Sequence, residues 1–175
     1  MRGVRTVVAV IGALLLSACG GGDGAGTPAD VATGPPRIAE PGPFTGECGH
    51  VTDAEIQSIT TLSAPSDIFR NSVTCRWFYT GQSTDVTFVS YRGSPIERER
   101  AWEVLWGRQL DTIEIAGRSG FLSYTPDGVD SEVCVLALGL GDDFFEWSYR
   151  GRIAAPRASC DMIRRFAELT VERLR

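Results

Sequence analysis

Residues 71–79 have the sequence NSVTCRWFY, in which every second residue from Val73 to Tyr79 is apolar or aromatic. Such alternation is typical of a β-strand with one buried face, because successive side chains point to opposite sides of a sheet. A short glycine-containing loop follows, and residues 85–91 have the pattern of a second strand. The two runs therefore predict an antiparallel hairpin.

Three helices are predicted around this hairpin. Thr52 and Glu55 have the spacing of a capping box, which begins a short first helix. Residues 94–97 (SPIE) form a second capping box with proline at the first helical position, and this helix is expected to reach about Leu110. The C-terminal helix, from about residue 159 to residue 174, has an apolar stripe that is expected to face the sheet.

Further short strands are expected between the second and third helices, at residues 112–116, 119–124, 132–138 and 144–149. Hairpin connections dominate, so we predict a single α+β domain with a mainly antiparallel sheet and helices packed on one side. Trp102, Leu105 and Trp106 lie three and four residues apart on one face of the second helix. We expect that face to pack into the core.

The N-terminus has the features of a bacterial lipoprotein signal. Arg2 and Arg5 precede the ten-residue apolar run Val7–Leu16. A helix of that length covers only about 15 Å, half of a hydrocarbon core, which indicates a cleaved signal and not a permanent membrane span. The sequence Leu-Ser-Ala-Cys closes the run. We therefore expect Cys19 to be the lipidated first residue of the mature chain.

The chain divides into three predicted parts. Residues 1–18 are the signal peptide, residues 19–47 are the lipidated cysteine and a flexible stalk, and residues 48–175 are the α+β ectodomain. The stalk is rich in glycine and proline and has almost nothing to bury, so it cannot form a core. The expected location is the extracytoplasmic face of the cell membrane, where the lipid anchor holds the protein.

The charge of the chain excludes one large class of partner. The formal net charge is −5, and loss of Arg2 and Arg5 with the signal would bring it to −7. A domain this acidic lacks the basic surface that nucleic acid requires, and it is repelled by anionic lipid headgroups. We therefore expect no nucleic-acid partner, and contact with the membrane only through the anchor.

The cysteines favour an oxidised ectodomain. There are five, at positions 19, 48, 75, 134 and 160, and acylation of Cys19 leaves four, which allow three pairings. We favour Cys48–Cys75 and Cys134–Cys160, because each joins a helix end to an adjacent predicted strand. A metal site is the rival use, but the single histidine and the lack of a Cys-x-x-Cys pair argue against it. No metal and no cofactor is predicted.

No catalytic residue is predicted. A Ser-His-Asp or Cys-His arrangement would have to use His50, the only histidine, which we interpret as a loop residue in front of a helix cap. Asp142, Asp143 and Glu146 form an acidic turn, which is more typical of a charged hairpin tip than of a calcium site.

One candidate anion site remains. Arg92, Arg98 and Arg100 gather near the start of the second predicted helix, and helix N-termini attract carboxylates and phosphates. Glu97 and Glu99 are interleaved with these arginines and partly cancel their field.

Several runs of the sequence resemble an uncharacterised family of actinobacterial envelope lipoproteins. They are Asn71-Ser72-Val73 with Cys75 and Trp77, Tyr91-Arg92-Gly93-Ser94-Pro95-Ile96 with Arg98-Glu99-Arg100, Ser119-Gly120-Phe121, and Asp142-Asp143-Phe144 with Glu146-Trp147-Ser148. The cysteine at position 19 and the four ectodomain cysteines also fit. The resemblance implies a membrane-anchored envelope protein. It carries over no catalytic residue, because the family has no established activity.

Two functions fit these observations, and neither is enzymatic. The first is a binding or adaptor module that contacts envelope proteins or wall polymers. The alternative is a carrier or sensor of an apolar envelope ligand, held between the sheet and the helices around Trp77, Trp102, Trp106 and Trp147. A hydrolase that uses His50 is a third and weaker hypothesis. The sequence identifies neither the ligand nor the oligomeric state.

Overall fold

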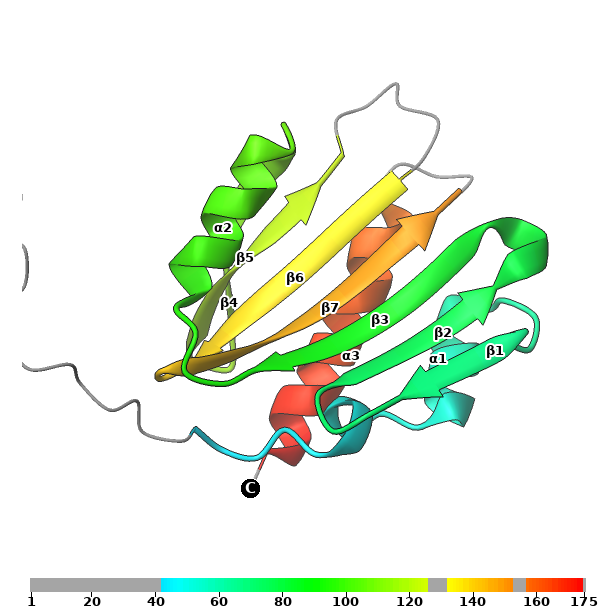
Figure 1. Cartoon of the computed structure of the whole chain (residues 1–175), viewed down its shortest axis with the longest axis horizontal. Coiled ribbons are helices and arrows are strands. Elements are labelled where there is room, and N and C mark those ends of the chain that lie inside the picture. Colours follow the sequence, from blue (N-terminus) through cyan, green and yellow to red (C-terminus); the bar gives the residue numbers. More distant parts are fainter. Residues whose placement is uncertain (1–41, 126–131, 153–156, 175) are drawn as a thin grey trace, which may run out of the picture. The chain divides into compact units, whose positions relative to one another are not determined.

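The computed structural model describes residues 42–125, 132–152 and 157–174 (Figure 1). Cys19, the predicted signal peptide and most of the predicted stalk lie outside these residues. Within the described residues, no helix has the length and apolar character needed to cross a membrane.

The described residues contain seven strands, which form one antiparallel sheet in the order β1-β2-β3-β7-β6-β5-β4. The strands are β1 (Asp67–Arg70), β2 (Thr74–Tyr79), β3 (Thr84–Tyr91), β4 (Gln109–Ile115), β5 (Arg118–Tyr124), β6 (Glu132–Leu140) and β7 (Asp143–Gly151). The helices are α1 (Asp53–Thr60), α2 (Ile96–Leu105) and α3 (Ala158–Arg173), with short 3-10 turns at η1 (Glu47–His50) and η2 (Thr80–Gln82).

The helices do not all lie on the same face of the sheet. Cys134 of β6 is disulfide-bonded to α3, so every second residue of β6 from Cys134 faces that helix. Val135, on the other face, pairs in register with Ser123, whose hydroxyl donates to Glu103 of α2. Figure 1 accordingly shows α2 and α3 on opposite sides of the sheet. The predicted α+β class with an antiparallel sheet is confirmed, and of the three helices α1 and α3 share one side.

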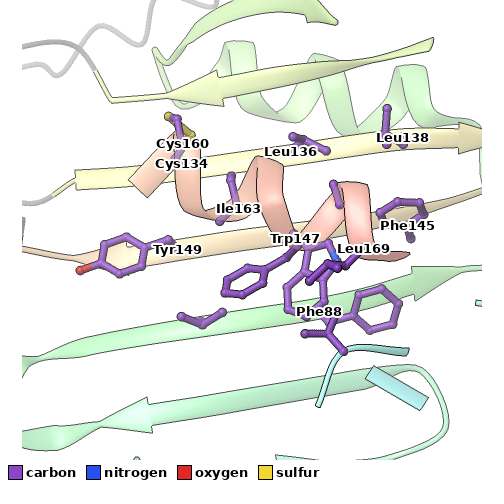
Figure 2. Packing of buried hydrophobic residues seen from close by; sticks show 14 of the residues in the cluster. Phe88, Cys134, Leu136, Leu138, Phe145, Trp147, Tyr149, Cys160, Ile163 and Leu169 are labelled. Carbon is purple, nitrogen blue, oxygen red and sulfur yellow. A yellow bond between two sulfur atoms is a disulfide. The ribbon is translucent and has the colours of Figure 1, made fainter. Parts of the chain in front are cut away.

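The main hydrophobic core lies between the sheet and α3. Trp147 of β7 stacks on Trp77 with ring centroids 5.9 Å apart, and it also contacts Phe88 at 5.1 Å and Phe166 of α3 at 4.9 Å. All of these aromatic side chains are almost fully buried. Figure 2 shows the core residues of β6 and β7 pointing toward α3, which contributes Ile163. The alternation seen in residues 71–79 thus marks the face that α3 covers.

The two predicted capping boxes have different outcomes. In α1 the box forms: the Thr52 hydroxyl accepts from the Glu55 N–H, and the Glu55 carboxylate accepts from the Thr52 N–H. Arg173 of α3 also donates to both carboxylate oxygens of Glu55, at 2.5 and 2.9 Å. These hydrogen bonds, first from Arg173 and then from the Thr52 backbone, lower the pKa of Glu55 to about 2. They fasten α1 to α3.

In α2 the predicted box does not form, and the prediction is wrong. The N-cap residue is Pro95, whose side chain makes no capping bond, and the Ser94 hydroxyl is buried without a hydrogen-bond partner in the described residues. Glu97 pairs with Arg100 at 3.2 Å instead of reaching back to the cap. A local spacing rule fails here because the side-chain acceptor has a better partner one turn further along the helix.

Two boundaries also differ from the prediction. Gly107 adopts a left-handed φ of 70°, a conformation that ends helices, so α2 stops at Leu105 and not near Leu110. The chain then enters β4 earlier than expected. The short edge strand β1 was not predicted, because its four residues show no regular alternation.

The ordered domain begins before the predicted boundary at Cys48. The Gly42 N–H donates to Asp143 at 2.8 Å, and Thr45 is buried with its hydroxyl 3.2 Å from that of Ser90. The last residues assigned to the stalk therefore lie against the domain.

Both predicted disulfides are present, Cys48–Cys75 and Cys134–Cys160, with sequence separations of 27 and 26 residues. The first joins η1 to β2, and the second joins β6 to the first turn of α3. Each closes a loop of similar length, so the chain-entropy model assigns them similar stabilising effects.

Replacing Cys134 and Cys160 together by Ala should lower the free energy of unfolding by about 3.5 kcal/mol, the loop-closure term for a loop of this length. Urea unfolding followed by circular dichroism measures the loss. The Cys48→Ala, Cys75→Ala protein is the matched comparison, and its loss should agree within about 1 kcal/mol. Losses that differ severalfold would show that the entropy of the unfolded chain is not the main contribution.

Candidate functional site

Four of the seven exposed large apolar side chains in the described residues lie on α2 or directly after it. Trp102 is 52% exposed, Trp106 is 62% exposed and Leu105 is 79% exposed. The two indole rings meet edge to face, with centroids 5.8 Å apart. The prediction that this face packs into the core is therefore wrong.

The reason for that error lies in the residue that α2 does bury. Glu103 is only 3% exposed, and its carboxylate accepts hydrogen bonds of 2.5 Å from Ser123 of β5 and from Arg108. A hydrogen-bonded and ion-paired carboxylate can face the sheet at low cost. Because Glu103 faces the sheet, Trp102 and Trp106 face solvent. The spacing of the apolar residues alone does not reveal this orientation.

A groove runs beside α2 across the part of the sheet face that this helix leaves uncovered. Its volume is about 540 Å³. Strands β2, β3, β6 and β7 form its floor through Arg76, Thr87, Val135, Glu146 and Ser148. Helix α2 and the turn after it supply the wall through Glu99, Trp102, Glu103, Trp106 and Arg108. Pockets of this size are typical of small-ligand sites.

Glu146 lies on the floor of this groove and is only 9% exposed. Its Oε2 atom has no hydrogen-bond partner in the described part of the chain. Burial, followed by the nearby carboxylates of Glu99 and Glu103, raises the pKa of Glu146 to about 8. At neutral pH the side chain is therefore mainly protonated, and it can both donate and accept a hydrogen bond.

The arginines of the groove are mostly held by carboxylates. Arg76 pairs with Asp85 at 2.9 Å, and Arg108 pairs with Glu103 at 2.5 Å. The Nε atom of Arg76 is buried and, like Glu146 Oε2, has no hydrogen-bond partner in the residues described. Two residues that line the groove, Arg76 and Glu146, thus each carry a buried polar atom without a hydrogen-bond partner among the described residues.

The three arginines of the candidate anion site are partly engaged elsewhere. Arg92 pairs with Asp143 at 2.8 Å. Arg100 pairs with Glu97, lies over the Phe121 ring at 4.9 Å and donates to the Gly120 carbonyl. Arg98 lies on the first turn of α2. This pairing reduces the positive charge that an anion would meet, so it gives the predicted anion site no support.

Asp143 has a structural role that sequence reasoning missed. It is buried, and it accepts hydrogen bonds of 2.8 Å from the N–H groups of Gly42 and Gly93 and from Arg92. Burial alone would raise the pKa of Asp143, but the two backbone hydrogen bonds and Arg92 lower it overall. Asp143 does lie at the tip of the β6–β7 hairpin, as the sequence indicates, but it is buried there because it binds the backbone of Gly42 and Gly93.

His50 lies in η1 and is only partly exposed. Its carbonyl accepts a 2.6 Å hydrogen bond from Arg173, and its ring lies edge-on to Phe44. The neighbouring Cys48 is bonded to Cys75 and offers no free thiol. In the residues that the structure describes, no group of three His, Cys, Asp or Glu side chains is placed to hold a metal ion.

The four tryptophans do not share one site. Trp77 and Trp147 lie in the core beneath α3, whereas Trp102 of α2 and the C-cap residue Trp106 lie at the other face of the sheet. The layer between the sheet and α3 is filled by aromatic side chains. The structure therefore gives no support to an apolar ligand held there among all four tryptophans.

Comparison with known proteins identifies relatives but no activity. Proteins named "Putative lipoprotein LprB" from Mycobacterium tuberculosis, Mycobacterium bovis and Mycobacterium leprae are each 36% identical to this chain over 110 residues. That segment is 61% of this chain and 60% of the M. tuberculosis protein, so the chain spans about three fifths of the length of these relatives. No solved structure matches.

The names of these relatives support the lipoprotein prediction made from residues 1–19. A family model described as "Protein of unknown function (DUF3558)" matches residues 14–173, far more than half of the chain. The protein therefore belongs to the DUF3558 family, whose function is unknown.

Proposed function

We propose that this protein is a membrane-anchored, extracytoplasmic lipoprotein that acts as a binding or adaptor module in the cell envelope and catalyses no reaction. Acylation at Cys19 holds it to the membrane, and two or three acyl chains give stable attachment where a single chain would be marginal. The lipoprotein names of the relatives support the anchor. The predicted signal peptide supports the outer face, and so do the two disulfides, because disulfides form in oxidising compartments.

The exposed face of α2 is the observation that carries the binding role. Trp102, Val104 and Leu105 of α2 and the C-cap residue Trp106 are all more than half exposed beside the groove. Soluble domains rarely expose clustered large apolar side chains without a binding partner, and tryptophan is enriched at interaction hot spots. The opposite face, covered by α1 and α3, presents no comparable cluster in the described residues.

A photo-crosslinking amino acid at position 105 in intact cells should capture a specific envelope component. Leu105 is the most exposed apolar residue of α2 and does not line the groove, so the probe should leave the fold unchanged. The matched control is the same probe at Gln57, an exposed position on α1. Mass spectrometry of the crosslinked products measures the outcome.

We expect a discrete product from position 105 that is absent with the Trp102→Ala, Trp106→Ala protein, and little product from position 57. Equal products from both positions, or none from position 105, would contradict a binding role for α2. Phase partition of the same lysates in detergent checks the anchor. The mature chain should enter the detergent phase. Mass spectrometry should find an acyl group on residue 19 of the wild-type chain and none on residue 19 of the Cys19→Ser chain.

A further inference from the structure

We propose that the groove beside α2 binds a neutral saccharide chain, whose hydroxyl groups pair with Glu146 and Arg76 and whose ring faces lie on Trp102 and Trp106. This inference rests on the proposed binding role and names the chemical class of the ligand. It stands on three features of the groove, namely its unsatisfied polar atoms, its charge balance and its aromatic wall.

The unsatisfied polar atoms call for a ligand group that can both donate and accept. Arg76 Nε–H is only a donor, whereas the Glu146 carboxyl lacks a partner for Oε2. Leaving such buried atoms unpaired costs free energy, which a ligand recovers when the side chains of Arg76 and Glu146 turn toward it. A hydroxyl group carries one donor and two acceptor positions, and adjacent hydroxyl groups of a sugar ring can serve both atoms.

The charge balance of the groove disfavours ionic ligands. Its floor and wall hold three arginines, Arg76, Arg108 and Arg150, and three carboxylates, Asp85, Glu99 and Glu103. The remaining acid is Glu146, whose protonated form is favoured by burial and by the acidic neighbours. A cation would be repelled by the arginines, and an anion would be repelled by the carboxylates. A neutral polar ligand meets neither penalty and can hydrogen-bond to groups of both signs.

The aromatic wall of the groove offers a surface on which the C–H face of a sugar ring can pack. A pyranose or furanose ring has faces of C–H groups with partial positive charge, and the faces of an indole carry the negative part of its quadrupole. Trp102 and Trp106 are half exposed at the edge of the groove and need no rearrangement of the core to receive such a ring. The volume of about 540 Å³ is enough for a short segment of an oligosaccharide.

Isothermal titration of the mature lipoprotein tests this assignment. The protein is held in a polyoxyethylene detergent, because alkyl-glycoside detergents carry sugar headgroups that would compete. The probes are neutral tetrasaccharides built from hexoses, pentoses or N-acetylhexosamines, with tripolyphosphate and spermidine as charged comparisons. We expect at least one neutral tetrasaccharide to bind with a Kd of about 1 mM or tighter.

Variants assign the binding to the groove. Trp106→Ala should weaken the affinity at least tenfold, whereas Val104→Ala, an exposed substitution on the same helix that does not line the groove, should leave it unchanged. Glu146→Gln keeps one donor and one acceptor at the same place and should retain binding. Glu146→Met removes both, and it should lose binding in protein whose circular dichroism is unchanged.

The assignment is overturned if no neutral tetrasaccharide binds at a concentration about tenfold above the expected Kd. It is also overturned if a charged probe binds more tightly than every neutral one, or if Trp106→Ala leaves the affinity unchanged. Each of these results leaves the crosslinking test at position 105 free to succeed. A failure of the saccharide assignment is therefore distinguishable from a failure of the binding role.

Discussion

The free energy of unfolding of the wild-type protein is expected to fall between pH 5 and pH 8, and the Glu146→Gln substitution should abolish this fall. The pKa of Glu146 is raised to about 8 in the folded protein from an ordinary value of 4.5. Between these two values the folded chain holds a proton that the unfolded chain has released, so the free energy of unfolding falls as the pH rises. The stabilising contribution is complete below about pH 4.5 and is lost as the pH approaches 8.

The size of this effect follows from the shift in pKa. Each unit corresponds to about 1.4 kcal/mol, so the wild-type protein should lose on the order of 4 kcal/mol relative to Glu146→Gln over this range. Urea unfolding of both proteins at several pH values, with the disulfides intact, measures the difference. Parallel curves for the two proteins would show that the Glu146 carboxyl is not held in its neutral form by burial.

Trp147→Ala should destabilise the fold by roughly 3–5 kcal/mol, the cost of emptying an aromatic site in a packed core. Trp147 has no exposed surface, stacks on Trp77, contacts the tilted ring of Phe166, and donates from Nε1 to the Thr170 hydroxyl at 3.0 Å. Its removal leaves a cavity between β7 and α3 at the centre of the cluster drawn in Figure 2.

Trp102→Ala is the matched control, because it deletes the same side chain from a half-exposed site on α2. Its effect on the free energy of unfolding should stay within about 0.5 kcal/mol. Thermal or urea unfolding of the two variants in the same buffer gives the comparison. Similar losses in both proteins would mean that Trp102 belongs to the core and that α2 offers no free aromatic surface.

Local sequence signals predicted the fold class and much of the core. The alternation in residues 71–79 marked the buried face of β2, and Thr52 with Glu55 marked the start of α1. The disulfides followed from cysteine positions relative to predicted elements. These features depend on neighbouring residues and on the period of secondary structure, which a sequence contains explicitly.

The groove could not be predicted in the same way. It depends on which side of α2 faces the sheet. That orientation is fixed by hydrogen bonds to Glu103 from the nearby Arg108 and from Ser123, which lies 20 residues away in the sequence. The burial of Glu146 likewise results from long-range pairing of β7 with β3 and β6. The residue that α2 buries, Glu103, is charged and therefore gave no sign of burial in the sequence. Trp102 and Trp106 wrongly indicated that their own face was buried.

Hydrogen–deuterium exchange of the full lipoprotein tests most directly whether α2 is the face that contacts the envelope. Exchange is measured by mass spectrometry in isolated envelopes and again after extraction into detergent. We expect slower exchange in the envelopes for peptides that cover residues 96–108, with little change in α1 and α3. Protection confined to α1 and α3, or identical exchange in both preparations, would contradict this expectation.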